Sequence, residues 1–515
     1  MNVSAARRVL LCALLLGIAG DALVDFDKLG LGFVLWVLLV IGCAAWSLAV
    51  STREIASGPA SHSAEVGARD RTLLLGMAAV AVVGIVLRDT ELLMGLDFLA
   101  ALAAAALLAW RARGRSLASL RLVDVPVAVV DAGLTTGFGA AVLAGRDAAG
   151  DLAADATAGS GVIAVRRHLS LALIGSIFAL PVLAVLTGLL GNADPVFGNF
   201  LNVVGEFIAT DLMRHVITAA ALAWFVGGWL RGIRTPMVKE LPRVAKTPRV
   251  AFALTAPALY ATTAVLTLYL GVQSRSLFGG AAFVERTAGL SYADYARGGF
   301  FELVAVSVIV LMMLLVVDIL LDREDAHAER RFGSVGWVLI MLVSVLMLSA
   351  LWRMGLYMRF YGLSADRVYA VAAMVWIGAV LALFAMTVLR GRAERLGAGL
   401  VAVSFTWLFL LNVVNPQALV ARVNLARAGD GKSFDSQYHA ERTADAVPAL
   451  LAGAGQLPAA ECTALVSSLR ERWVGKGEAA GWRGWQLPRA RAERLLTPSA
   501  EVLAQRHCVE APPGA

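Results

Sequence analysis

The sequence predicts an all-α fold, a polytopic transmembrane helix bundle followed by a small helical domain outside the membrane. Of its 515 residues, 59% are hydrophobic and only 16% are charged, whereas a soluble domain is roughly half apolar. Long apolar stretches alternate with short polar loops, and a helix needs about 20 residues to cross the hydrocarbon core. Within these stretches polar and apolar residues do not alternate as barrel strands require, so the spans are predicted to be helices.

We predict eleven spans from their length and apolar composition. In chain order they are residues 9–24, 29–50, 73–87, 92–110, 169–190, 212–230, 250–272, 298–320, 335–357, 368–389 and 396–414. Arg7 and Arg8 before the first span are also typical of a signal peptide. Asp21, Asp25 and Asp27 stand where a small-residue cleavage site would lie, which favours a retained span.

Basic residues in the loops predict the orientation. The net charge of +7 gathers in short loops between spans, which is typical of membrane topology and does not indicate nucleic-acid binding. With a cytoplasmic amino terminus, all arginine-rich loops fall inside, namely those with Arg53, Arg69, Arg71, Arg111, Arg113, Arg115, Arg121, Arg231, Arg234, Lys239, Arg243, Lys246, Arg249, Arg323, Arg330, Arg331, Arg390, Arg392 and Arg395. A crossing at 123–145 would reverse the later loops, so this segment is interpreted as an interfacial or re-entrant helix on the cytoplasmic side.

Four regions follow from this topology. They are a four-span region at 1–122, an interfacial helix and linker at 123–168, a seven-span core at 169–414 and a helical extracytoplasmic domain at 415–515. An odd number of spans places the last region outside. Asn415 as a helix cap and Pro416 at the first helical position predict where its first helix begins. The expected location is a bacterial inner membrane.

The last region contains two of the four cysteines, Cys462 and Cys508. An oxidising compartment would let them form a disulfide. The alternative is two unpaired thiols buried in a helical domain, and the sequence leaves both interpretations open.

No cofactor or metal site is predicted. The stretch "ARAGDGKS" at 426–433 resembles a phosphate-binding loop, but Ala426 replaces its first glycine and no strand precedes it. Neither a histidine pair at metal spacing nor a G-x-S-x-G motif occurs.

Polar residues at span ends predict a polar site on the outer face. Residues 194–208 repeat apolar side chains at helical spacing, which predicts a helix lying in the outer interface as a structural lid or as part of a ligand site. Charges near hydrocarbon are usually paired or functional, and the candidates are Asp194, Glu206, Tyr295, Arg297, Glu302, Arg353, Arg359 and Asp25. Arg297 is predicted to pair with Asp194, Glu206 or Glu302. The competing interpretation is anchoring by aromatic residues and snorkelling arginines.

Several motifs together resemble a bacterial family of multi-pass inner-membrane proteins known only as a domain of unknown function. They are "ADPVF" at 193–197, "YARGGFFELV" at 295–304, "LYMRFYGLSADRVYA" at 356–370, "NPQALVARVNLAR" at 415–427, "ADAVPALL" at 444–451 and "WRGWQLPRARA" at 482–492. The resemblance implies a shared architecture and outer face from about the fifth span onward. It implies no activity, substrate or catalytic residue.

Three classes of function fit these observations. The first is an envelope protein in the lipid bilayer that binds a ligand or protein partner at its outer face and does not act as an enzyme. The second is a secondary transporter, which would need polar groups deep in the membrane, where Asp97 and Asp318 are the outliers. The third is an enzyme on a lipid-linked substrate, similar in outline to many-span glycosyltransferases, with Asp21, Asp25 and Asp27 as its acidic group.

Overall fold

The computed structural model describes residues 3–55, 62–112, 116–120, 124–143, 190, 193–200, 211–235, 250–278, 300–321, 325–474 and 481–508. Within these residues all regular elements are helices, apart from one isolated bridge between Val250 and Leu321. Eight of the described helices are long and apolar enough to cross a membrane. The prediction of an all-α polytopic bundle is therefore confirmed.

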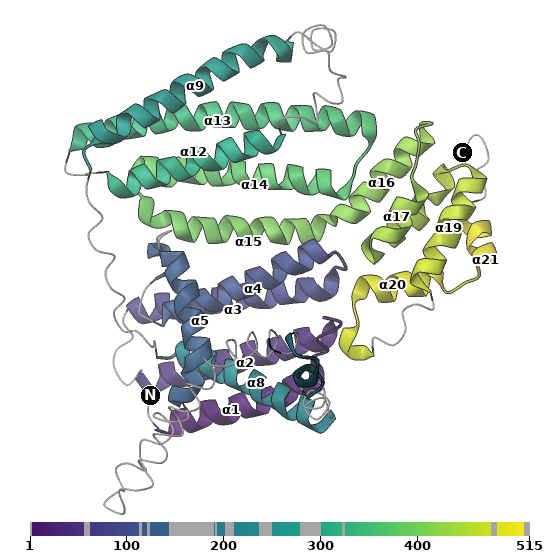
Figure 1. The fold of residues 1–515 in the computed structure, drawn as a ribbon, viewed down its shortest axis with the longest axis horizontal. Helices are drawn as coiled ribbons and strands as arrows, with labels where there is room; N and C mark the ends of the chain where they lie inside the picture. Colours follow the sequence, from purple (N-terminus) through teal and green to yellow (C-terminus); the bar gives the residue numbers. More distant parts are fainter. Residues whose placement is uncertain are drawn as a thin grey trace, which may run out of the picture.

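The bundle consists of two packed groups of helices (Figure 1). The first comprises α1 (Val3–Leu23), α2 (Leu31–Ile55), α3 (His62–Leu87), α4 (Glu91–Arg111), η1 (Leu117–Ser119), α5 (Asp124–Val142) and α8 (Asp211–Gly232). The second comprises α9 (Phe252–Phe278), α12 (Phe300–Leu320), α13 (Ala326–Tyr361), α14 (Ala365–Thr387), η3 (Val388–Arg390), η4 (Ala393–Arg395) and α15 (Leu396–Val414). Because α15 contacts both α14 and α4, it joins the two groups.

Eight predicted spans coincide with the eight helices that can cross a membrane. The predicted spans 9–24 and 212–230 are the helices α1 and α8, which carry charges such as Arg8 and Arg231 and are not among the eight. These two helices pack against each other, and His215 of α8 lies 2.8 Å from the Asp21 carboxylate of α1. The predicted span 169–190 lies outside the described residues except for Leu190.

The bundle has two ends, which we name for what they carry. The tail face carries residues 416–474 and 481–508 and the turns that join α3 to α4 and α13 to α14 (Figure 1). The arginine face is the opposite end, where the chain begins at α1. Its helix ends and turns carry Arg111, Arg231, Arg234, Arg330, Arg331, Arg390, Arg392 and Arg395.

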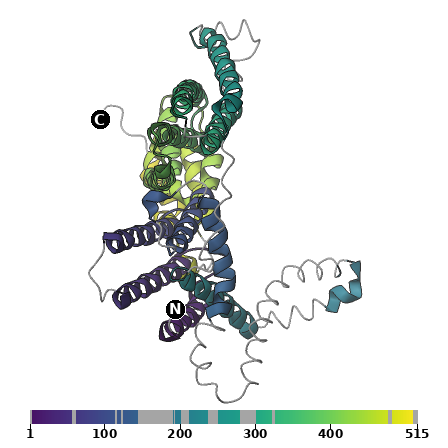
Figure 2. The same ribbon diagram turned by 90° about the vertical axis from the view of Figure 1, so that its left-hand side faces the viewer.

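Helix α5, within the segment predicted to be interfacial, runs across the neighbouring helices and not alongside them (Figure 1). Its apolar part, Val127–Val142, is shorter than the spans. Two glycines allow the close crossing with α8, because a Cβ on Gly139 would lie 2.7 Å from the carbonyl oxygen of Gly228. Trp224 of α8 fixes the crossing by donating its indole N–H to the carbonyl of Gly137, 2.7 Å away. The side view in Figure 2 shows α1 to α4 fanned beside this crossing.

The tail domain is helical, with a buried core of its own. It comprises α16 (Pro416–Gly429), α17 (Ser436–Arg442), η5 (Ala444–Ala446), α18 (Val447–Gly453), η6 (Ala454–Gln456), α19 (Ala459–Trp473), η7 (Trp482–Gly484), α20 (Leu487–Leu496) and α21 (Ala500–His507). Asn415 caps α16 by accepting from the backbone N–H of Ala418, and Pro416 is the first helical residue. A disulfide joins Cys462 of α19 to Cys508, which follows α21.

The predicted outer helix 194–208 is described only as far as residue 200. Asp194 begins it by accepting a hydrogen bond from the backbone N–H of Val196 at 2.8 Å. Val196 and Phe200 are exposed. Its role as a lid or a site stays a prediction.

Candidate functional site

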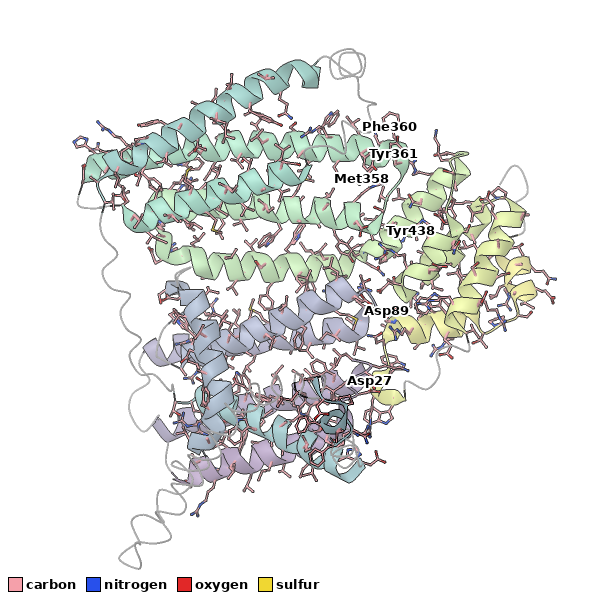
Figure 3. The ribbon with its side chains drawn as sticks, in the orientation of Figure 1. Asp27, Asp89, Met358, Phe360, Tyr361 and Tyr438 are labelled. Carbon is pink, nitrogen blue, oxygen red and sulfur yellow. A yellow bond between two sulfur atoms is a disulfide. The ribbon has the colours of Figure 1, made fainter. Side chains whose placement is uncertain are left out.

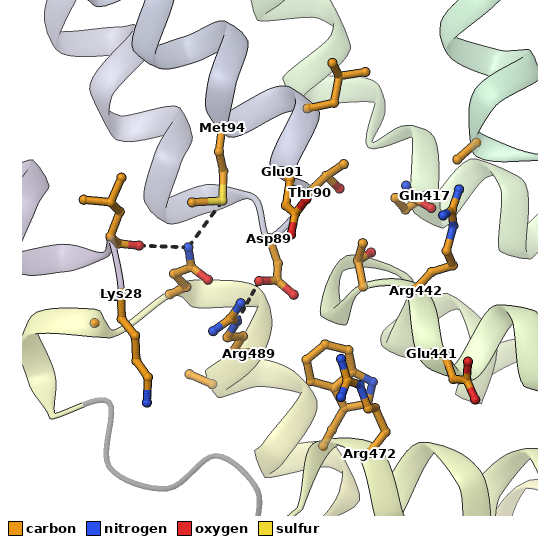
Figure 4. A pocket seen from close by; sticks show the side chains of 18 of the residues that line it. Lys28, Asp89, Thr90, Glu91, Met94, Gln417, Glu441, Arg442, Arg472 and Arg489 are labelled. Carbon is orange, nitrogen blue, oxygen red and sulfur yellow. Dashed lines mark hydrogen bonds and ion pairs between the residues drawn. The ribbon is translucent and has the colours of Figure 1, made fainter. Parts of the chain in front are cut away.

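A cavity of about 970 Å³ lies between the tail domain and the tail face of the bundle. Its walls come from the α1–α2 turn, the α3–α4 turn, the first turns of α14 and α16, and the tail segments α17, α19 and α20 (Figure 4). Figure 3 places Asp27 and Asp89 on this side of the bundle, facing the tail domain. Because the tail domain and the bundle both supply its walls, the shape of the cavity depends on how the tail domain is docked.

Two buried aspartates, which we call the aspartate clasp, dock the tail domain. Asp89 follows α3 and accepts from Arg489 Nε at 2.6 Å and from the backbone N–H of Ala444 at 3.1 Å. Asp445 of η5 accepts from the backbone N–H of Asp89 at 2.8 Å and from the Thr90 hydroxyl at 3.1 Å. Their side chains are only 3% and 1% exposed, so these bonds are shielded from water and stronger for it.

Arg88 extends the clasp into the membrane bundle. Its Nη1 lies 3.5 Å from Asp445 Oδ1, and its Nε donates to the backbone carbonyl of Asn412 at 2.8 Å. Asn412 Nδ2 in turn donates to Asp97 Oδ1 at 3.0 Å. Burial raises the pKa of the Asp445 carboxyl, while the N–H of Asp89 and the charge of Arg88 oppose that rise. A polar chain therefore runs from Asp97 in α4 to the clasp.

A second contact docks α16 onto the turn between α13 and α14. Asn424 bonds to both backbone groups of Leu363, since its Oδ1 accepts from the N–H at 2.8 Å and its Nδ2 donates to the carbonyl at 2.7 Å. Arg427 Nη2 donates to the carbonyl of Phe360 at 3.0 Å, and Nη1 donates to that of Met358 at 3.4 Å. The bond to Phe360 satisfies a carbonyl in the last turn of α13, where the helix leaves carbonyls without an intrahelical partner.

A third contact joins η7 to the start of α2. The backbone N–H of Leu31 donates to the carbonyl of Trp485 at 2.9 Å, and Gln486 Nε2 donates to the carbonyl of Leu29 at 3.1 Å. Glycines allow this approach, because a Cβ on Gly30 would lie 2.7 Å from the carbonyl oxygen of Gly484. The contact places Trp485 and Gln486 in the wall of the cavity.

The cavity wall combines aromatic, neutral polar and charged side chains. The aromatic residues are Phe26, Tyr369, Trp473 and Trp485. The charged residues besides the clasp aspartate Asp89 and its partner Arg489 are Asp27, Lys28, Glu91, Asp366, Glu441, Arg442, Arg472 and Glu493. Thr443 and Gln486 of the wall each have a buried side-chain oxygen, Oγ1 and Oε1, with no hydrogen-bond partner among the described residues. The wall therefore combines hydrogen-bonding and charged groups with aromatic rings.

The structure disperses the candidate residues predicted from the sequence. Arg353 is buried within α13, while Asp194, Glu302 and Arg359 are exposed on separate helices. None of these four lines the cavity, and Asp25 touches it only indirectly, since its carboxylate accepts from the backbone N–H of the lining residue Asp27 at 3.0 Å. Glu206, Tyr295 and Arg297 lie outside the described residues, so the proposed Arg297 ion pair stays a prediction.

The sequence did contain a signal for the cavity. The motifs at 356–370, 415–427, 444–451 and 482–492 supply the three docking contacts. What sequence reasoning missed was the partner of Asp445 and Arg489, the loop of Arg88, Asp89 and Thr90 between two ordinary spans. Three polar residues in a short loop do not predict a docking contact unless the segment that faces them is known.

The chain matches a family model. The family model described as "Domain of unknown function (DUF4153)" matches residues 75–453, nearly three quarters of the chain. The chain belongs to this family. The match begins within α3 and ends with α18, so it includes the clasp aspartates and leaves out α19 to α21. No curated protein and no solved structure matches the chain.

The buried imidazole of His439 predicts a pH dependence of tail docking. Burial lowers the pKa of His439 to about 4, so the ring is neutral and its Nε2 can accept from Asn424 Nδ2, 3.1 Å away. Phe434 stacks on the ring, and the nearby Asp435 charge raises the pKa slightly. The folded pKa is below the unfolded value near 6.5, so the stabilisation is complete above about pH 6.5 and is lost as the pH falls through 4.

We therefore expect the free energy of unfolding of the tail to fall by about 2 kcal/mol between pH 7 and pH 5 through this group. His439→Gln keeps an acceptor for Asn424 and does not titrate. Thermal unfolding of both proteins at the two pH values should show a smaller pH dependence in the variant. Equal pH dependence would contradict the assignment.

Proposed function

We propose that this membrane protein binds a ligand of the cell envelope in the cavity between its tail domain and its bundle. The supporting observation is that Thr443 and Gln486 belong to the wall of a large cavity and each have a buried side-chain oxygen, Oγ1 and Oε1, without a partner among the described residues. An unsatisfied buried polar group costs about 1 to 3 kcal/mol. A ligand with complementary polar groups would recover that free energy.

We also propose that the protein lies in a bacterial inner membrane, with its amino terminus in the cytoplasm and its tail domain outside. The apolar helices and the family support a membrane protein. The arginine face supports the orientation, because cytoplasmic loops carry an excess of lysine and arginine.

The orientation predicts the behaviour of reporter fusions. An enzyme that is active only outside the cytoplasm should be active when fused after Gly429, at the end of α16. The same enzyme should be inactive when fused after Arg392, between α14 and α15. The reverse pattern would mean that the bundle is inserted the other way.

The binding proposal can be tested by filling the cavity. Ala490 of α20 lines it, and Ala490→Trp places a large side chain there. Ala460→Trp is the matched control on an exposed position of α19. A polar-lipid extract of bacterial membranes should raise the melting temperature of the purified wild type and control, since a ligand at 100 times its Kd stabilises by about 2.7 kcal/mol. An equal rise in Ala490→Trp would contradict binding in the cavity.

One observation favours catalysis as a second candidate function. Asp27 of the α1–α2 turn and Glu91 at the start of α4 both line the cavity. Carboxylates so placed can act as a general base on a lipid-linked substrate. In that case Glu91→Gln should retain binding of the extract component and abolish its turnover, whereas a pure binding protein shows no turnover in either form.

A further inference from the structure

Resting on the proposed function, we infer that the ligand is a lipid with a carbohydrate headgroup. Its sugar occupies the cavity, and its acyl chain follows the outer side of α4. Three features of the described residues support this assignment: the hydrogen-bonding character of the wall, its aromatic rings and the apolar surface that begins at its rim.

The wall offers acceptors beside the donors of Lys28, Arg442 and Arg472. The Gln486 amide is fixed, because its Nε2 donates to the carbonyl of Leu29 at 3.1 Å, and this leaves Oε1 as an acceptor. The carboxylates of Glu91 and Glu493 add further acceptors. A ligand rich in hydroxyl groups supplies the matching donors, and the Thr443 hydroxyl can bond to such a group as donor or acceptor.

Other acidic residues of the wall are already engaged, which favours hydroxyls over a simple cation. The Asp89 carboxylate pairs with Arg489 Nε at 2.6 Å. Glu441 accepts from the Gln437 side chain at 2.9 Å. The carboxylates therefore do not form one focused negative site, whereas a sugar uses acceptors spread around its ring.

Aromatic rings supply the second requirement of a sugar site. Tyr369 of α14, Trp473 of α19 and Trp485, which follows η7, line the cavity. The C–H faces of a sugar ring are apolar and pack on aromatic rings, which combine a large apolar face with a polar edge. Trp485 is held in place because its backbone carbonyl accepts from the N–H of Leu31 at 2.9 Å.

The third feature connects the cavity to the lipid. Leu92 lines the cavity, is 48% exposed, and begins a stripe with Leu96 and Leu99 on the same face of α4. Gly95 beside the stripe has open space where a side chain would be. A headgroup in the cavity would thus have its acyl chain directly on an apolar helix surface, as a lipid requires and a soluble sugar does not.

The test is native mass spectrometry of the full chain in detergent with defined lipids. Digalactosyldiacylglycerol is compared with phosphatidylethanolamine, phosphatidylglycerol and free galactobiose. The variants are Trp485→Ala and Thr443→Val. The matched controls are Trp482→Ala and Thr463→Val, at exposed positions that do not line the cavity. Because the Thr443 hydroxyl has no partner among the described residues, its removal should leave the fold intact.

We expect the glycolipid to be retained about tenfold more than either phospholipid, a difference of 1.4 kcal/mol. Retention should fall about tenfold in Trp485→Ala and about fivefold in Thr443→Val, and not in the controls. Equal retention of all three lipids that falls in both cavity variants would overturn the carbohydrate assignment and leave the proposed binding function standing. Retention unaffected by both cavity variants would overturn the two together. Binding of the free disaccharide as tight as that of the glycolipid would overturn the lipid part.

Discussion

Asp445→Ala is expected to lower the free energy of unfolding by about 3 to 5 kcal/mol, because it removes one partner from a buried charged network. Its carboxylate accepts from the backbone N–H of Asp89 and the Thr90 hydroxyl and lies 3.5 Å from Arg88. All three donors would lose this acceptor in a junction where the Asp445 side chain is only 1% exposed. Thermal unfolding of the detergent-purified protein measures the loss, and limited proteolysis should show a tail domain that is cut more readily.

Asp366→Ala is the matched control on the same face. Asp366 lies 3.6 Å from Arg442, but its side chain is 88% exposed. Exposed pairs contribute about 0 to 1 kcal/mol, so this variant should unfold close to the wild type. If Asp445→Ala is as stable as Asp366→Ala, the aspartate clasp does not hold the tail domain.

Loss of the disulfide is expected to destabilise the tail domain by about 3 to 4 kcal/mol in the chain-entropy model. Cys462 and Cys508 are 46 residues apart and close a long loop across α19 to α21. Cys508→Ser is the better variant, because Cys462 is fully buried and a hydroxyl there would lack a partner. Thermal unfolding in oxidising buffer should show the difference.

Reductant provides the internal control for this prediction. It should destabilise the wild type by a similar amount and leave Cys508→Ser unchanged, since that variant has no tail disulfide to reduce. Labelling of both thiols in protein taken from its native membrane without reduction would show that the disulfide does not form there. That result would also weaken the proposed extracytoplasmic position of the tail.

The sequence predicted an outer polar site, and the described candidate residues of that site do not line the cavity. It indicated an outer polar site from acids, arginines and tyrosines near span ends, but Arg353 and Glu302 lie on separate helices away from the cavity. A charged residue beside an apolar run shows only that the end of a helix lies near the membrane surface. Because every span has two such ends, these residues do not identify one site. Asp89 and Asp445 form the clasp although 356 residues separate the N–H of Asp89 from Asp445 Oδ2, and no local pattern encodes so distant a pairing.

The sequence by itself determined that this chain is a helical membrane protein with a helical tail domain. Hydrophobic length and composition decide membrane spanning locally, because each span must satisfy its own backbone hydrogen bonds in lipid. Asn415 and Pro416 likewise set the start of α16 through short-range capping. Only the tertiary structure decided that α8 packs with α1, that α5 crosses α8 at Gly139 and Gly228, and that the tail closes a cavity over the α3–α4 turn. Those outcomes depend on side-chain fit between segments far apart in the chain, and apolar helices in lipid have little hydrophobic preference for one neighbour over another.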